Sequence, residues 1–197
     1  MPSVKVALLG HSYVRDLFSV FDYGIECDCE FRFFFKPGAT VRGISMNENF
    51  VRSCIEWEPH VVFLLLGGND IRCDWDIKET FEVYKNFCAK LKERLSNLVL
   101  ICSTVEPRFA IANDRHRTPS LEQYNVAAKA FNRLLKKWTV PDYRFMTWGA
   151  NRLENVGLFA KDGVHLNTNG RKVMLRLIYD LVIKVVANMT SDNMQKE

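Results

Sequence analysis

The chain has 197 residues, of which 48% are hydrophobic and 25% are charged, so it is apolar enough to bury a core and is neither disordered nor collagen-like. No stretch approaches the roughly 18 uncharged apolar residues of a membrane helix, and we expect no stable membrane insertion. The net charge of +4 permits an anionic partner without indicating one. The start, Met-Pro-Ser-Val-Lys-Val, lacks the basic and apolar regions of a signal peptide, so we expect a cytoplasmic protein.

Apolar runs in the first half of the chain predict strands that alternate with helices. Residues 4–9 form a β-branched and aliphatic run that predicts a buried strand, and residues 13–21 place apolar side chains at helical spacing. Apolar and charged residues alternate over 27–33, which is the pattern of an edge strand with one wet face. Residues 41–57 predict a helix, and the wholly apolar run 61–66 predicts a central strand.

The second half of the chain continues the alternation. Residues 77–95 and 121–138 predict helices, and the second of these follows a Pro-Ser start signal. Short apolar runs at 98–102 and 143–147 predict the fourth and fifth strands. A final helix is expected over 170–187, because apolar residues fall on one face there.

Five strands that alternate with helices predict an α/β fold with a five-stranded parallel sheet, since parallel neighbours need crossover helices. The expected architecture is a three-layer flavodoxin-like domain with strand order 2-1-3-4-5. No linker or repeat divides the chain, so we expect a single domain over residues 1–188 and a disordered tail over 189–197. In such sheets ligands bind outside the carboxyl ends of the strands, and the loops there are the first place to look for a site.

Six cysteines and four histidines are the candidates for disulfides or metal ligands. The cysteines contain no C-x-x-C spacing and most lie inside apolar runs, which predicts buried free thiols. The histidines are scattered, and none pairs with a cysteine at ligand spacing, so the sequence predicts no metal site. The cysteines are Cys27, Cys29, Cys54, Cys73, Cys88 and Cys102.

Four short blocks of glycine and polar residues fall at the expected strand ends. They are Gly10-His11-Ser12, Pro37-Gly38-Ala39-Thr40, Gly67-Gly68-Asn69-Asp70 and Asp162-Gly163-Val164-His165. Acyl transfer by a serine enzyme needs a nucleophile, a base, a group that orients the base, and donors for the developing oxyanion. The four blocks contain a candidate for each of these roles.

Ser12, at the start of a predicted helix, is the candidate nucleophile. Asp162 lies three residues before His165, close enough in one turn to hold the imidazole of a general base in the right tautomer. Asn69 offers a side-chain N–H, and Gly38 lets the backbone approach a substrate without a Cβ in the way. Ser12, Gly38 and Asn69 are therefore the predicted oxyanion donors.

These four blocks resemble those of the SGNH or GDSL-type hydrolases, which are named for a serine, a glycine, an asparagine and a histidine in separate blocks. Each block alone is weak, but four in order at strand ends are specific, and the resemblance spans nearly the whole chain. It implies a serine-dependent carboxylic-ester hydrolase of esterase, lipase or acetylesterase type, which acts on a small-molecule, lipid or sugar ester and needs no metal or cofactor.

His11 departs from the family pattern, in which an aspartate usually precedes the serine. The departure removes no member of the predicted Ser12, His165 and Asp162 triad, and we interpret His11 as structural or as a polar group for substrate. The elbow G-x-S-x-G of ordinary α/β-hydrolases is absent, because Val14 stands where its second glycine would be.

Several residues near the blocks have two interpretations. Trp148 and Phe159 precede the Asp-His turn and line a substrate pocket in one interpretation or the core in the other. Glu106, Arg108 and the basic run 115–117 follow the fourth strand, where they bind an anionic group or form a solvated loop. Taken alone, Ser12 would be a helix N-cap, since serine is a preferred cap.

A catalytically weak or inactive SGNH-like domain that binds RNA or protein is the alternative, because some domains of this type have lost their catalytic residues and bind RNA. The basic pairs Lys136-Lys137 and Arg171-Lys172 fit that alternative. Retention of all four blocks favours the hydrolase.

Overall fold

Parallel strands form one sheet that carries helices on both faces. The computed structural model describes residues 3–21, 29–72, 76–110, 119–138, 143–146 and 155–194, and for 143–146 and 190–194 it describes the backbone. The strands are β1 (Val4–Gly10), β2 (Cys29–Phe35), β3 (Val61–Leu65), β4 (Val99–Ser103) and β5 (Tyr143–Met146). The helices are α1 (Ser12–Phe18), α2 (Val41–Ser45), α3 (Glu48–Glu56), α4 (Ile77–Arg94), α5 (Leu121–Lys137) and α6 (Thr168–Met194), with short 3₁₀ helices η1 (Gly68–Asp70) and η2 (Val156–Leu158).

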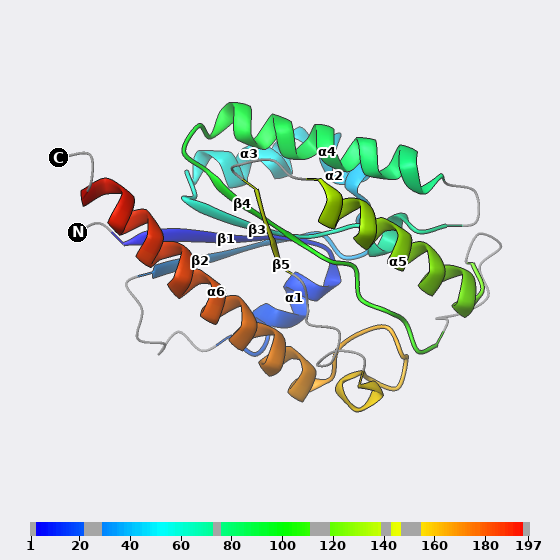
Figure 1. Ribbon diagram of the computed structural model, residues 1–197. Coiled ribbons are helices and arrows are strands. Elements are labelled where there is room, and N and C mark those ends of the chain that lie inside the picture. Colours follow the sequence, from blue (N-terminus) through cyan, green and yellow to red (C-terminus); the bar gives the residue numbers. More distant parts are fainter. Residues whose placement is uncertain are drawn as a thin grey trace.

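The sheet has the order β2-β1-β3-β4-β5, and each pair of neighbours is parallel. The predicted α/β class and the 2-1-3-4-5 order are therefore confirmed. Figure 1 shows the start of β1 and the end of α6 at one end of the molecule, with the carboxyl ends of the central strands toward the other. The loops that carry the four blocks leave the sheet at those carboxyl ends.

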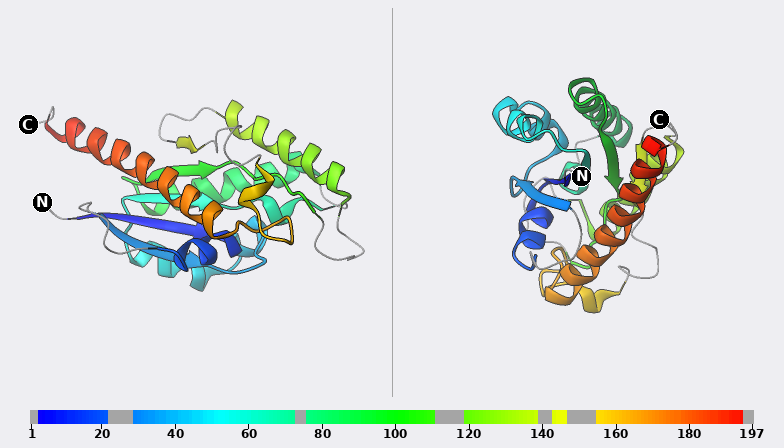
Figure 2. Two further views of the ribbon diagram at one scale, coloured as in Figure 1. Left: turned by 90° about the horizontal axis from the view of Figure 1, so that it is seen from below. Right: turned by 90° about the vertical axis from the view of Figure 1, so that its left-hand side faces the viewer.

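Two apolar cores, one on each face of the sheet, hold the three layers together (Figures 1 and 2). Alternate side chains of the central strands point to opposite cores: Ala7 and Leu9 of β1 pack toward α2–α5, whereas Val6 and Leu8 pack toward α1 and α6. All of these side chains are fully buried. The apolar runs 6–9 in β1 and 61–65 in β3 are thus the sequence signature of strands covered on both faces.

The alternating segment forms the edge strand β2, as predicted. Phe31 and Phe33 turn inward and pack against Phe21, with ring centroids 5.2 and 4.8 Å from its own. On the opposite side Glu30 and Arg32 are exposed, whereas Phe34 packs at the edge of the core that contains α2–α5. One face of β2 is therefore apolar and the other is largely polar, as period-two alternation requires.

The single helix predicted over 41–57 is two helices, so this prediction was wrong in its continuity. The side chain of Asn47 accepts a hydrogen bond from the Phe50 N–H at 3.2 Å and caps a new helix, α3. Asparagine competes with helical hydrogen bonding inside a helix and favours the cap position.

Helix α6 ends later than the sequence predicted. It continues to Met194, past the expected end at Ala187, so the described part of the segment expected to be a disordered tail is helical. Val186 and Met189 still pack against the core on the α1 and α6 face. Packing of an apolar face, rather than intrinsic propensity, sustains most helices in proteins, and it carries α6 beyond the obvious periodicity.

Cys54, Cys88 and Cys102 are buried free thiols, as predicted, and Cys29 is half-buried on β2. Cys27 and Cys73 lie outside the described residues. Across the described ranges, no helix is long and apolar enough to span a membrane. The same ranges hold no group of three or more histidine, cysteine or acidic side chains arranged to bind a metal ion.

Candidate active site

The candidate nucleophile sits where β1 passes into α1. Gly10 ends β1 in close contact with β3, and a Cβ at this position would lie 2.3 Å from the Leu65 carbonyl oxygen. Only glycine fits such an approach. The next residue, His11, caps α1 by accepting the Tyr13 N–H at 3.4 Å, and Ser12 is the first residue of the helix. Packing between two central strands therefore fixes the position of Ser12.

Ser12, His165 and Asp162 form a chain of hydrogen bonds. Ser12 Oγ lies 3.0 Å from His165 Nε2, and His165 Nδ1 lies 2.7 Å from Asp162 Oδ2. The other carboxylate oxygen, Asp162 Oδ1, accepts the N–H groups of Val164 and His165, each at 2.9 Å. Partial burial alone would raise the pKa of Asp162, but the hydrogen bonds from His165 and the backbone outweigh it and lower the pKa. The carboxylate is thus charged and oriented toward the imidazole.

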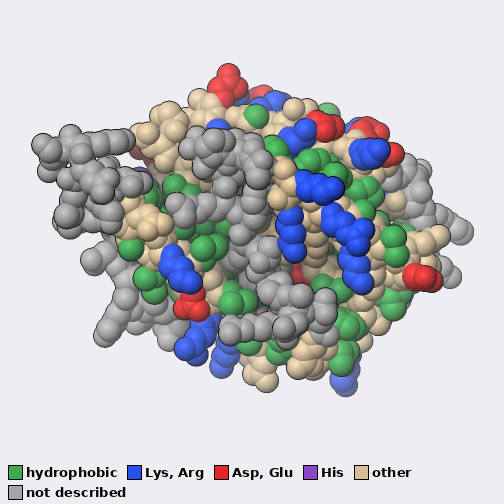
Figure 3. Space-filling model, in the orientation of Figure 1, with side chains coloured by type: hydrophobic (Ala, Val, Ile, Leu, Met, Phe, Trp, Pro, Cys, Tyr) green, Lys and Arg blue, Asp and Glu red, His purple; other side chains and the backbone are tan. Residues whose placement is uncertain are grey.

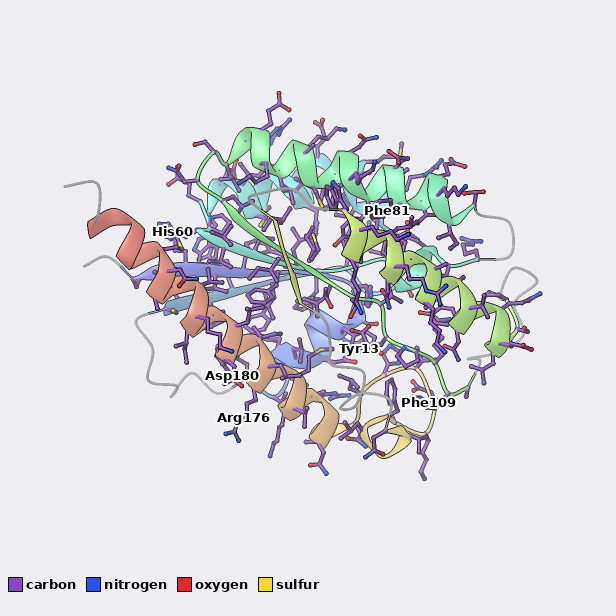
Figure 4. All side chains as sticks on the ribbon, in the orientation of Figure 1. Tyr13, His60, Phe81, Phe109, Arg176 and Asp180 are labelled. Atoms are coloured by element: carbon purple, nitrogen blue, oxygen red, sulfur yellow. The ribbon has the colours of Figure 1, made fainter. Side chains whose placement is uncertain are left out.

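Two contacts hold the loop of Asp162 and His165 against the rest of the molecule. The Tyr13 hydroxyl donates to the Val164 carbonyl at 2.5 Å, and the Phe109 N–H donates to the Gly163 carbonyl at 2.8 Å. Gly163 has a φ of +64°, and a Cβ there would lie 2.4 Å from the Ala110 nitrogen. Figure 4 shows Tyr13 and Phe109 on the side of the molecule where α6 begins.

The second and third blocks are joined by hydrogen bonds. Asn69 Nδ2 donates to the Ala39 carbonyl at 3.1 Å, and both carboxylate oxygens of Asp70 accept the Val41 N–H, at 2.9 and 3.0 Å. Gly38 has a φ of +73°, and no heavy atom lies within 4 Å of where its Cβ would be. The loop that carries Gly38 is therefore clamped to the block that carries Asn69, with open space in front of the glycine.

Two buried ionisable groups flank the site. Burial lowers the pKa of one, a base, and raises the pKa of the other, an acid. Burial, followed by electrostatic interactions with His165 and Arg108, lowers the pKa of His11 to about 3. Burial raises the pKa of Asp70 to about 7, although the Val41 N–H favours its carboxylate. In both cases the apolar surroundings favour the neutral form.

A cavity of about 560 Å³ is lined by one residue from each of the four blocks, namely Ser12, Gly38, Asn69 and His165. His11 also lines it. The structure therefore brings together residues that are up to 153 positions apart in the chain. The described wall also includes four charged side chains: Arg15, Arg72, Glu106 and Arg108.

Of the two apolar residues predicted to contact substrate, the structure describes one. Phe159 is 6% exposed and packs against Phe109, with ring centroids 4.8 Å apart, in the core on the α1 and α6 face. It is not part of the described cavity wall. Trp148 lies outside the described residues.

Sequence reasoning missed the role of Tyr13, which looked like one more apolar position on a helical face. A buried tyrosine needs a partner for its hydroxyl, and this was the available signal. Tyr124, whose ring lies at the cavity wall, was missed for the same reason.

The fold, with the four blocks at the carboxyl ends of its strands, is that of an SGNH-type hydrolase. The chain belongs to the GDSL-like lipase/acylhydrolase family, whose model matches residues 34–173. The predicted family is confirmed, and with it the enzyme class, a GDSL-type serine esterase. The matched stretch includes Gly38, Asn69, Asp162 and His165, whereas Ser12 precedes it and is brought to the site by β1. No curated protein sequence matches the chain.

Solved structures of this fold are similar over most of the chain. A carbohydrate esterase family 3 protein from Talaromyces cellulolyticus has a TM-score of 0.66 at 14% identity and covers 94% of this chain and 99% of its own. A GDSL-like lipase from Bacteroides thetaiotaomicron has a TM-score of 0.62 at 18% identity, covering 92% and 88%. The psychrotrophic esterase EstA from Pseudoalteromonas has a TM-score of 0.61 at 14% identity, covering 93% and 98%. At these identities the likeness is one of fold.

Proposed function

We propose that the protein is a serine-dependent carboxylic-ester hydrolase in which Ser12 is the nucleophile, His165 the general base and Asp162 the residue that orients His165. The observation that carries the proposal is the unbroken chain of short contacts from Ser12 Oγ through both imidazole nitrogens to Asp162. An isolated serine is a poor nucleophile, and an imidazole within hydrogen-bond reach is the usual means of activating it.

The reaction has two steps of the same kind. Ser12 Oγ attacks the ester carbonyl while its proton passes to His165 Nε2, and collapse of the tetrahedral intermediate releases the alcohol with that proton. Water then attacks the acyl-enzyme, again giving a proton to His165, and the carboxylic acid leaves as Ser12 takes the proton back. Asp162 holds Nδ1–H throughout and stabilises the imidazolium that forms in each step.

The oxyanion formed in each step would be stabilised by the N–H groups of Ser12 and Gly38 and by the side-chain amide of Asn69. Within the part of the chain that the structure describes, neither of the two backbone N–H groups donates to another residue. Asn69 uses one amide N–H for the Ala39 carbonyl, which leaves the other for substrate. Donors that are fixed before the reaction cost no reorganisation when charge develops.

Labelling by a fluorophosphonate tests the proposal directly, and the similar esterase EstA has been solved inhibited by monoethylphosphonate. We expect labelling of Ser12 together with hydrolysis of p-nitrophenyl acetate, and loss of both in Ser12→Ala and His165→Ala. Ser53→Ala, which removes an exposed serine hydroxyl from α3, is the matched control and should behave as the wild type. A folded wild type that is neither labelled nor active would exclude the hydrolase.

The contribution of Asp162 is tested by Asp162→Asn. The amide keeps an acceptor for the loop N–H groups but cannot carry the charge that stabilises the imidazolium. We expect kcat to fall by up to about 10⁴-fold with a smaller change in KM. An unchanged kcat would remove Asp162 from the mechanism.

A basic face on α5 keeps the RNA-binding alternative testable. Lys129, Arg133, Lys136 and Lys137 are exposed, and Figure 3 shows Lys and Arg side chains gathered over this helix. Such a face attracts phosphates through a salt-dependent interaction. RNA binding that weakens steeply with salt, survives in Ser12→Ala and is lost in a Lys136→Glu/Lys137→Glu double variant would establish it. Absence of binding at low salt would exclude it.

A further inference from the structure

Three hydrogen-bond donors converge on Gly68, next to the proposed oxyanion donor Asn69. A Cβ at Gly68 would lie 3.2 Å from the Tyr124 hydroxyl oxygen and 3.8 Å from His11 Nε2. Arg108 Nη2 lies 3.4 Å from the Gly68 carbonyl oxygen. All three side chains line the cavity that contains Ser12. A side chain at Gly68 would crowd the Tyr124 hydroxyl, so the glycine leaves these donors uncovered beside the cavity.

Arg108 is held in place from two directions. Its guanidinium lies over the Tyr124 ring, with Cζ 4.0 Å from the ring centroid. Its backbone is clamped to α5 by Asn125, which accepts the Arg108 N–H and donates to the Arg108 carbonyl, both at 2.9 Å. A guanidinium fixed in this way loses little conformational entropy when it binds a ligand.

Each of the three side chains has an N–H or O–H group that can donate a hydrogen bond to a ligand. His11 Nδ1 accepts the Tyr13 N–H, so the neutral ring carries its proton on Nε2. Burial raises the pKa of Tyr124 to about 12, and its hydroxyl keeps its proton at physiological pH. His11 and Tyr124 are 5% and 3% exposed, so a group bound between them is largely removed from water.

Resting on the proposed function, we propose that His11, Arg108 and Tyr124 form a carboxylate-binding subsite, and that the preferred substrates are esters that carry a carboxylate near the scissile bond. A carboxylate has acceptors only and matches both the planar guanidinium and the two neutral donors. The family pattern has aspartate where His11 stands, and a negative charge there would repel such a group.

The other charged groups of the cavity wall also favour an anion over a cation. Arg15 and Arg72 are basic, and Arg15 is paired with Asp16, its nitrogen 2.7 Å from the carboxylate oxygen. Glu106 is the acidic residue of the described wall, and its charge contributes to the raised pKa of Tyr124. Among the described residues of the wall, basic side chains thus outnumber acidic ones.

Matched ester pairs test the subsite and show which side of the substrate carries the carboxylate. Monomethyl succinate against methyl butyrate places it on the acyl side, and 4-acetoxybenzoate against 4-methylphenyl acetate places it on the alcohol side. We expect kcat/KM, measured by pH-stat titration, to be at least about 10-fold higher for the anionic member of one pair, since a charge-assisted hydrogen bond supplies that much.

Arg108→Gln should abolish this preference, bringing the ratio of kcat/KM within the pair to about one or below. Arg52→Gln makes the same change of charge at an exposed position on α3, outside the cavity, and should keep the wild-type ratio. An active enzyme without preference in either pair, or a preference that survives Arg108→Gln, would overturn the subsite.

Binding separates the failure of the subsite from the failure of the proposed function. Isothermal titration of monomethyl succinate and of 4-acetoxybenzoate into Ser12→Ala protein requires no turnover. We expect one of them to bind, and the Ser12→Ala/Arg108→Gln double variant to lose that binding. Binding without any wild-type esterase activity would refute the hydrolase and keep the subsite, whereas activity without this binding would refute the subsite alone.

Discussion

The buried and the exposed halves of the candidate active site are held in place by different means. His11 and Asp70, at the ends of β1 and β3, are 5% and 1% exposed and belong to the packed edge of the sheet. The side chains of Asp162 and His165 are 41% and 32% exposed and lie in a loop. The first half owes its position to core packing, and the second to a few hydrogen bonds from Tyr13 and Phe109.

This difference separates stability from catalysis. A substitution that strains the backbone of the buried half should destabilise the fold, because this half belongs to the packed central strands. Damage to the loop should misplace the base while the sheet stays folded. A displacement of 1 Å in a catalytic group is enough to cost about 10²-fold in rate.

The largest effect on stability is expected from a substitution at Gly10, and Gly163 in the loop is its comparison. Gly10→Ala drives a Cβ into the Leu65 carbonyl of β3, and we expect a loss of about 3 kcal/mol or more in the free energy of unfolding by urea titration. Gly163→Ala strains the loop against Ala110 and should cost esterase activity at least about 10-fold, with a smaller loss of stability. Equal losses of stability in the two variants would show that the loop is part of the same cooperative unit.

Removal of the asparagine amide tests the buried half as a source of catalysis. In Asn69→Ala we expect kcat to fall by about 10²–10³-fold with KM nearly unchanged, because the contact strengthens only as negative charge develops. Steady-state kinetics with p-nitrophenyl acetate measures both parameters. A change confined to KM would assign Asn69 to ground-state binding instead.

Removal of one hydroxyl tests the tether of the exposed half. Tyr13→Phe leaves the Val164 carbonyl without its donor, and we expect kcat to fall about 10-fold at constant KM, with about 1 kcal/mol lost in stability. Tyr84→Phe removes another fully buried tyrosine hydroxyl, in the core on the α2–α5 face, and should leave kcat unchanged. If the two variants have the same kcat, Tyr13 does not position the base.

The pH dependence of stability tests the burial of Asp70. Its native pKa of about 7 lies above its unfolded value, so between about pH 4 and pH 7 the native state holds a proton that the unfolded chain has released. This contribution is fully present below pH 4 and is lost as the pH rises toward 7. We expect Asp70→Asn to gain stability relative to the wild type between pH 5 and pH 8, by up to about 3 kcal/mol.

Urea titrations of the two proteins at both pH values measure that gain. His11 titrates in the opposite sense, because its native pKa of about 3 is depressed and its contribution is lost as the pH falls. The difference between Asp70→Asn and the wild type cancels the His11 contribution. A difference that does not change with pH would mean that Asp70 keeps a normal pKa.

The smallest effect on activity is expected at Phe159, which packs in the core and not in the cavity. Phe159→Leu should lower stability by about 1 kcal/mol and leave kcat/KM within about twofold of the wild type for every ester tested. A change in the preference for acyl chain length would show that Phe159 contacts the substrate.

The sequence predicted most where a pattern reports the environment of a whole element. A β-branched and aliphatic run identified β1, a wholly apolar run identified β3, and alternation identified β2 as an edge strand, because burial on one or two faces restricts residue type. The sequence predicted less where a single side chain determines where a helix begins or ends. The break between α2 and α3 depends on the cap at Asn47, and the continuation of α6 depends on the packing of Met189.

For the site, the sequence by itself determined the family and the four blocks, since each block needs particular residue types at a strand end. Only the tertiary structure decided which further side chains reach those blocks: Tyr13 tethers Val164, Arg108 reaches Gly68, and Phe159 turns away into the core. The physical reason is that local patterns record burial and turns, whereas a contact between loops depends on how several elements pack at once.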